Sequence, residues 1–128
     1  MRILAIETSG AMQSVAALDG GDLLAELPLD RSQRGARSLA PTLAQLLRQV
    51  AWKPCEVELV AVAVGPGSFT SLRVGVTTAK AFAYAVSARV LGIGTLEIIA
   101  AQATEAAAGG QVAVAVDAQR GDVYAARY

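Results

Sequence analysis

The chain has 128 residues, of which 54% are apolar and 17% charged, so it holds enough apolar material for about one folded domain. Its 11 basic and 11 acidic residues give a net charge of zero, which argues against autonomous nucleic-acid binding, because phosphate neutralisation requires a basic surplus. The loose basic cluster of Arg31, Arg34 and Arg37 is read as a solvated loop. The sequence contains no histidine, which excludes the common zinc hydrolases and Ser-His-Asp or Cys-His catalysis, whereas carboxylate-bound Mg²⁺ remains open.

The cysteine content and the hydropathy pattern indicate the compartment. The single cysteine, Cys55, excludes an internal disulfide, and we expect its thiol to be buried and inert. The opening segment, MRILAIETSG, becomes polar too early for a signal peptide, and no stretch reaches the ~18 apolar residues of a membrane span. We therefore expect a soluble cytoplasmic protein that makes no contact with a membrane.

The first segment of the chain predicts an antiparallel meander. Residues 2–8, 13–19 and 23–29 each read as a strand. Gly20-Gly21-Asp22 predicts a tight turn between the second and third of them, and Pro28 marks a strand edge or end.

The rest of the chain alternates helices and strands. Apolar residues at helical spacing predict a helix from Leu39 to Trp52, in which Pro41 either lies in the first turn or produces a kink. Residues 58–64, ELVAVAV, are rich in valine, which is typical of a strand covered on both faces. The remaining predicted elements are a helix over 70–86, a buried strand over 88–94, a helix over 95–108, and strands over 111–118 and 122–128.

The order β-β-β-α-β-α-β-α predicts an α/β fold in which a mixed sheet carries packed helices. It is the order of a ribonuclease H-like lobe, as found in actin-like ATPases. We assign residues 1–108 to this N-terminal lobe. We expect residues 109–128 to begin a second lobe that is truncated in this chain.

The motif Gly65-Pro66-Gly67-Ser68 lies between a predicted buried strand and a predicted helix. Backbone N–H groups at a helix N-terminus and the helix dipole favour an anion, and glycines permit its close approach. The GK[ST] ending of a P-loop is absent, however, and Pro66 removes one donor. The motif therefore fits either a plain turn that begins the helix or a contact with a nucleotide phosphate.

A second polar motif, Glu7-Thr8-Ser9-Gly10, ends the first predicted strand. In actin-like and sugar-kinase-like folds, an acidic residue and small polar residues at this position face Mg²⁺ and phosphate. An exposed strand end with ordinary turn residues is the alternative, and the motif alone does not decide between them.

The helix over 70–86 is more apolar than a surface helix needs to be. Its polar residues form one narrow stripe, namely Arg73, Thr77, Lys80, Tyr84 and Ser87. A surface helix requires an apolar stripe only somewhat wider than about 100°. Because the preceding helix is similarly apolar, the pair predicts a face for a protein partner, unless the two helices bury this surplus against each other.

Two segments carry a resemblance to a known family: ILAIETSGAMQSVAAL near the N-terminus and VAVGPGSFTSLRVGVTTAKAFA from Val62 onward. They resemble the TsaB (YeaZ) family of bacterial tRNA threonylcarbamoyladenosine biosynthesis. The run from Gly65 to Gly75 is highly specific, and VDAQRGDVYAARY resembles a third family segment. The resemblance spans the whole chain and matches about the N-terminal half of a typical member.

The sequence also departs from related patterns. TsaD-like paralogues share similar motifs but carry a histidine-based metal motif, which a chain without histidine lacks. Ser71 stands where the TsaB family usually has glycine, and Gly35-Ala36 stands where many members have His-Ser.

The resemblance implies a non-catalytic subunit of the actin/Hsp70/sugar-kinase-like fold with a degenerate nucleotide cleft. Members of the family pair with a TsaD-like paralogue, or with themselves, through the two helices of the N-terminal lobe. A TsaE-like ATPase also binds the pair, and tRNA is held mainly by the assembly, in which TsaD forms N6-threonylcarbamoyladenosine beside the anticodon. No cofactor is required, and weak binding of ATP or ADP remains open.

Periodicity places the partner face at Leu43, Leu47, Val74, Thr78 and Phe82. The residues that would form the degenerate cleft are Glu7, Thr8, Ser9, Gly65, Gly67 and Ser68. We expect no catalytic or metal-ligating residue. The alternative is an ATP- and Mg²⁺-binding enzyme of the sugar-kinase-like group that uses the same two loops, while a peptidase would lack the histidine it needs.

Overall fold

The computed structural model describes residues 1–30, 38–106 and 110–128, so the basic cluster at Arg31, Arg34 and Arg37 lies outside the described residues. The elements are β1 Arg2–Glu7, β2 Ser14–Asp19, β3 Asp22–Pro28, α1 Leu39–Gln49, η2 Pro54–Glu56, β4 Leu59–Gly65, α2 Phe69–Val86, β5 Arg89–Gly94, α3 Thr95–Ala106, β6 Ala113–Gln119 and β7 Asp122–Arg127. The predicted order is confirmed, and the short 3-10 helix η2 is the one element in these ranges that the sequence reading does not predict.

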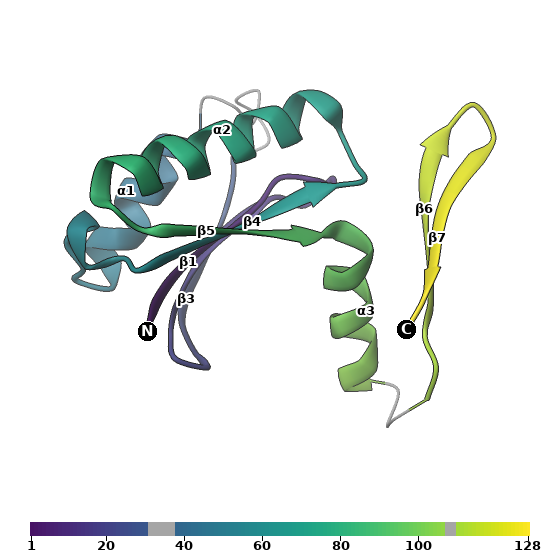
Figure 1. The fold of residues 1–128 in the computed structure, drawn as a ribbon, viewed down its shortest axis with the longest axis horizontal. Helices are drawn as coiled ribbons and strands as arrows, with labels where there is room; N and C mark the ends of the chain where they lie inside the picture. The colour runs from purple at the N-terminus through teal and green to yellow at the C-terminus, as the bar shows by residue number, and fades with distance from the viewer. Residues whose placement is uncertain (31–37, 107–109) are drawn as a thin grey trace.

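The main sheet has five strands in the order β3-β2-β1-β4-β5 (Figure 1). The strands β1, β2 and β3 pair antiparallel as a meander, and β4 and β5 continue the sheet in parallel with β1. This arrangement confirms the predicted α/β fold with a mixed sheet.

The core lies between one face of the sheet and the helices α1 and α2 (Figure 1). Alternate residues of the central strands point into it, as the period of two requires. These buried strand residues are Leu4, Ile6, Val15, Ala17, Val60 and Val62. They meet the buried stripe of α1, which consists of Leu39, Leu43, Leu46 and Leu47.

The helix α2 is seated on the sheet through small residues. Its buried residues are Gly75, Ala79 and Ala83, which recur every four residues on one face. The hydroxyl of Ser68 accepts the N–H of Ser71 at 3.5 Å, which caps the first turn, and Ser87 ends the helix with a left-handed φ of 61°.

Two predictions of burial are wrong. The strand β5 was expected to be buried but is an edge strand, with Val90 43% and Leu91 48% exposed. An apolar run does not reveal whether a strand has neighbours on both sides. Cys55 is exposed rather than buried, because it lies in η2, on the surface segment between α1 and β4.

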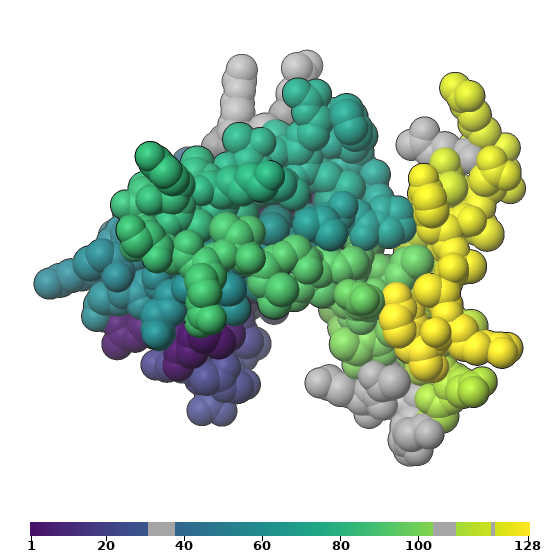
Figure 2. All heavy atoms as spheres, in the orientation of Figure 1, coloured from purple at the N-terminus to yellow at the C-terminus, as the bar shows by residue number. Residues whose placement is uncertain are grey.

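The strands β6 and β7 form a separate two-stranded antiparallel sheet, and β6 contacts α3. Figure 2 shows this hairpin beside the main body of the chain. The assignment of residues 109–128 to a second lobe stays a prediction. Within the described ranges, no helix combines the length with the hydropathy that crossing a membrane demands.

Candidate functional site

An open apolar groove of about 620 Å³ lies between α1 and α2. It forms because α1 packs on β2 and β3 while α2 packs mainly on β4, so the two helices lie over different strands. Its lining residues are Ala40, Leu43, Ala44, Leu47, Arg48, Trp52, Pro54, Thr77, Thr78, Ala81 and Phe82. The helices therefore leave part of their apolar surface uncovered, and a groove of this kind suits recognition of a helix.

Four residues predicted for the partner face line this groove, namely Leu43, Leu47, Thr78 and Phe82. Leu43 and Leu47 are only 4% and 5% exposed, so they belong mainly to the core and form the floor. Val74 lines an adjoining hollow of about 500 Å³, which shares Thr77 and Thr78 with the groove. The five residues thus lie along one continuous surface, and their contact with a partner stays a prediction.

The helical periodicity does not predict Trp52 as part of this surface. Its side chain is 8% exposed, yet it lines the groove just after the end of α1. The guanidinium of Arg2 lies 5.2 Å from the centre of its ring, a cation–π contact that holds the indole in place. A tryptophan directly after an amphipathic helix is itself a signal, because so large a ring extends the apolar face of that helix.

The outer stripe of α2 is confirmed as exposed, including Arg73, Thr77, Lys80, Tyr84 and Ser87. Tyr84 is 91% exposed and Phe69, at the start of the helix, is 74% exposed. The guanidinium of Arg73 lies 5.4 Å from the ring centre of Phe69. Exposed aromatic and arginine side chains of this kind are enriched at protein interfaces.

The structure brings the two predicted loop motifs together beside the N-terminus of α2. The backbone N–H of Ser68 donates to the carbonyl of Ser9 at 3.0 Å, and a Cβ on Gly67 would overlap this same carbonyl. The backbone N–H and the hydroxyl of Ser9 both donate to Glu7 Oε1 at 2.5 Å. The Ser68 N–H, one of the donors that could hold a phosphate, thus already has a protein acceptor, and the motif Gly65-Pro66-Gly67-Ser68 turns the chain and joins the two loops. Its contact with a nucleotide stays a prediction.

Three buried polar atoms near these loops lack a hydrogen-bond partner: Glu7 Oε2, Thr8 Oγ1 and Thr95 Oγ1. Glu7 and Thr8 lie at the carboxyl end of β1, and Thr95 follows β5. The carboxyl ends of parallel strands are where open α/β sheets place ligands. No group of three or more metal-ligating side chains occurs among the residues that the structure describes.

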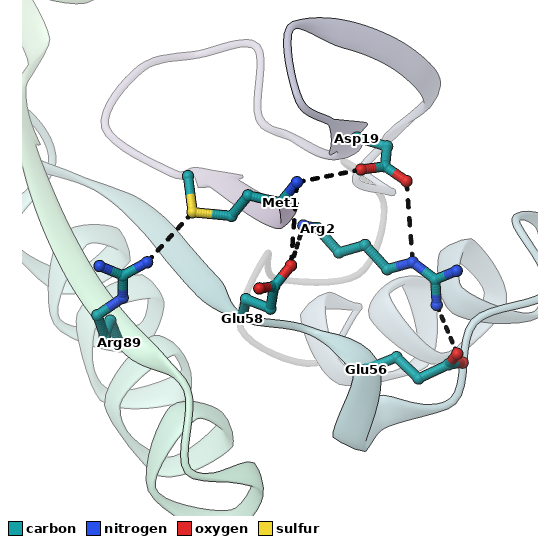
Figure 3. A network of polar contacts seen from close by, with 6 residues as sticks. All are labelled: Met1, Arg2, Asp19, Glu56, Glu58 and Arg89. Atoms are coloured by element: carbon teal, nitrogen blue, oxygen red, sulfur yellow. Dashed lines mark hydrogen bonds and ion pairs between the residues drawn. The ribbon is translucent and has the colours of Figure 1, made fainter.

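A polar network lies at the opposite ends of these strands (Figure 3). Arg2 bonds Glu56 Oε1 at 2.5 Å and lies 3.9 Å from Asp19, whose other oxygen is 3.3 Å from the Met1 amine. The pKa of the Glu56 carboxyl is lowered mainly by a hydrogen bond from the Lys53 backbone N–H and, to a smaller extent, by the hydrogen bond from the Arg2 side chain. The charges are matched to one another, which indicates a structural role in joining η2 to the sheet.

Comparison with known proteins places these features in a family. The chain matches the family described as "TsaD: tRNA N6-adenosine threonylcarbamoyltransferase" over residues 27–128. The chain belongs to this family. It is 32% identical to the tRNA threonylcarbamoyladenosine biosynthesis protein TsaB of Bacillus subtilis and 33% identical to that of Escherichia coli, in each case over 100% of this chain and 55% of the relative.

A solved structure titled YeaZ, from Pseudomonas aeruginosa, shares the fold with a TM-score of 0.88 and 31% identity, over 99% of this chain and 59% of that one. The TsaB/YeaZ resemblance and the ribonuclease H-like fold predicted from the sequence are confirmed. The chain spans about half the length of the curated relatives it matches.

Proposed function

We propose that this chain is a non-catalytic, TsaB-type partner subunit that supports a TsaD-like paralogue in forming N6-threonylcarbamoyladenosine beside the anticodon of tRNA. The open apolar groove between α1 and α2 carries this proposal, because it offers a preformed docking site for a helix. The reaction pathway in this proposal, tRNA threonylcarbamoyladenosine biosynthesis, comes from the names of the TsaB relatives.

The rest of the assembly follows from the same proposal. A TsaE-like ATPase binds the pair, and tRNA reaches this chain only through the complex, which agrees with a net charge of zero. The chain acts in the cytoplasm, requires no cofactor of its own, and can also pair with a second copy of itself through the groove.

Light scattering of the chain alone and mixed with the TsaD protein of the same organism tests the role. We expect a one-to-one complex that replaces any homodimer. Ala81→Gln places a polar side chain into the groove and is expected to weaken the complex, whereas Ala85→Gln, at an exposed position of α2 outside the groove, is not. Absence of a complex, or equal effects of the two variants, would contradict the proposal.

The second candidate is an ATP- and Mg²⁺-binding enzyme. The observation in its favour is the set of unpartnered buried oxygens of Glu7, Thr8 and Thr95 at the carboxyl ends of β1 and β5. A titration with labelled ATP, with and without Mg²⁺, separates the two candidates. Tight and Mg²⁺-dependent binding that Glu7→Gln abolishes would favour the enzyme.

A further inference from the structure

The charged side chains that the structure describes on α1 and α2 are all basic. Arg48 lines the groove, and Lys53 lies between two groove-lining residues in the sequence. Arg73 lines the adjoining hollow, and Lys80 stands on the outer stripe of α2. All four side chains are exposed. A chain with zero net charge therefore presents a locally cationic rim around its apolar groove.

No acidic residue shares these helices. The sequence contains no Asp or Glu over residues 38–55 or over residues 59–96. Of the two acids between these ranges, Glu56 lies beside Lys53 but already accepts from the Lys53 backbone N–H and bonds Arg2. Glu58 accepts the Arg2 backbone N–H at 2.8 Å. Among the described residues, the ion pairs involve Met1 and Arg2 rather than the cations of the rim.

We infer that the partner seated in this groove presents an acidic amphipathic helix. Its apolar stripe fills the groove, and its flanking Asp and Glu side chains face Arg48, Arg73 and Lys80. The inference rests on the proposed function, because it describes the partner of that same groove. Buried apolar area supplies the affinity, while the complementary charges select the partner and fix its orientation.

The same charges act against a second copy of the chain in this groove. A two-fold pair sets each face against itself, so cationic rims would lie opposite each other. Such like-charge contacts discriminate between partners as effectively as attractive ones. Self-association through the groove therefore strengthens as salt screens the repulsion, whereas binding of an acidic helix weakens with salt.

A nucleic acid is the other polyanion that could approach these cations. It would leave the apolar groove unfilled, and a chain without a basic surplus holds phosphate poorly. The combination of an apolar groove with a short cationic rim therefore favours a protein helix.

Three helical peptides test the inference on the whole 128-residue chain. They share one apolar stripe and differ only at the flanking positions, which carry Glu, Gln or Lys. The chain has a single tryptophan, Trp52, which lines the groove and reports binding by its fluorescence. In low salt we expect the Glu peptide to bind at least about tenfold more tightly than the Gln peptide and the Lys peptide to bind least, with the differences shrinking at high salt.

Charge-reversed variants test whether the preference for the Glu peptide depends on the cations beside the groove. The double variant Arg73→Glu/Lys80→Glu changes two exposed side chains of α2 and is expected to invert the order of the Glu and Lys peptides. Arg127→Glu, at an exposed position on β7, makes a similar change away from the groove and is expected to leave the order intact. Circular dichroism of each variant confirms that the fold is retained.

Equal binding of the three peptides, or preference for the Lys peptide, would overturn the inference while leaving the groove as a docking site. Binding of none would also overturn it, and light scattering with whole TsaD would still judge the proposed function separately. Competition between tRNA and the Glu peptide for the chain alone would assign the cations to phosphate and overturn it as well.

Discussion

Gly75 of α2 faces Thr8, at the end of β1, so closely that a Cβ on Gly75 would overlap the Thr8 hydroxyl oxygen. The contact sets the height of α2 above the sheet, because Gly75, Ala79 and Ala83 form the buried face of the helix. The position of α2 in turn sets the width of the groove beside it.

Gly75→Ala is expected to destabilise the fold. Overpacking of a tight contact costs about 1–3 kcal/mol, which exceeds the gain of up to about 1 kcal/mol that alanine brings to a helix interior. Chemical denaturation measures the difference. Gly21→Ala is the control, because a Cβ at Gly21 meets nothing within 4 Å, and we expect it to change stability by less than about 0.5 kcal/mol. A Gly75→Ala protein as stable as the parent would show that α2 shifts freely.

Thr8→Val tests whether the buried hydroxyl of Thr8 lowers the free energy of unfolding. Thr8 is 2% exposed and its Oγ1 has no partner, so removal of the hydroxyl is expected to stabilise the protein by about 1 kcal/mol. The matched variant is Thr42→Val, which removes a hydroxyl that donates to the Ser38 carbonyl at 2.7 Å and should destabilise by about 1 kcal/mol. Loss of stability in Thr8→Val would instead reveal a polar partner for this hydroxyl.

The helices of the groove could be predicted from the sequence because their apolar residues recur at helical spacing. That period assigns Leu43, Leu47 and Phe82 to one side of each helix before any contact is known. Periodicity within each helix does not, however, say how far apart two helices pack. Whether they would bury their apolar surplus against each other depended on the strands beneath them, and α1 packs on β2 and β3 whereas α2 packs mainly on β4.

The errors concern the outer edge of the sheet and the surface. The apolar run over β5 has the composition of a central strand, yet Val90 and Leu91 are exposed because β4 is its single neighbour in the sheet. The approach of the two polar loops, in which Ser9 accepts from Ser68, joins residues far apart in the sequence and has no local signature. Local patterns thus predict elements and faces, whereas neighbours across the sheet and between loops require the fold itself.

The pH dependence of stability is expected to include a contribution from Glu56. Its pKa lies below the ordinary value of 4.5, first because the Lys53 backbone N–H donates to it and then because of Arg2. A depressed folded-state pKa adds stability above about pH 4.5, which is lost as the pH falls through the folded-state value. The parent should therefore lose more stability than Glu56→Gln between pH 6 and pH 3. An equal loss of stability in both proteins over this range would contradict the assignment. Asp122→Asn, at the start of β7, controls for the loss of one carboxylate.

The hairpin of β6 and β7 is expected to exchange its amide hydrogens much faster than the main sheet. A two-stranded sheet alone is only marginally stable, and the described contacts that hold this one to the rest of the chain come mainly from α3. Val123 and Tyr124 are 65% and 53% exposed, so little apolar area resists its opening. Hydrogen exchange followed by mass spectrometry should therefore show early exchange over β6 and β7 and late exchange over β1 and β4, where Leu4 and Val60 are fully buried. Equal protection of both sheets would show instead that the hairpin and the main sheet unfold as one cooperative unit.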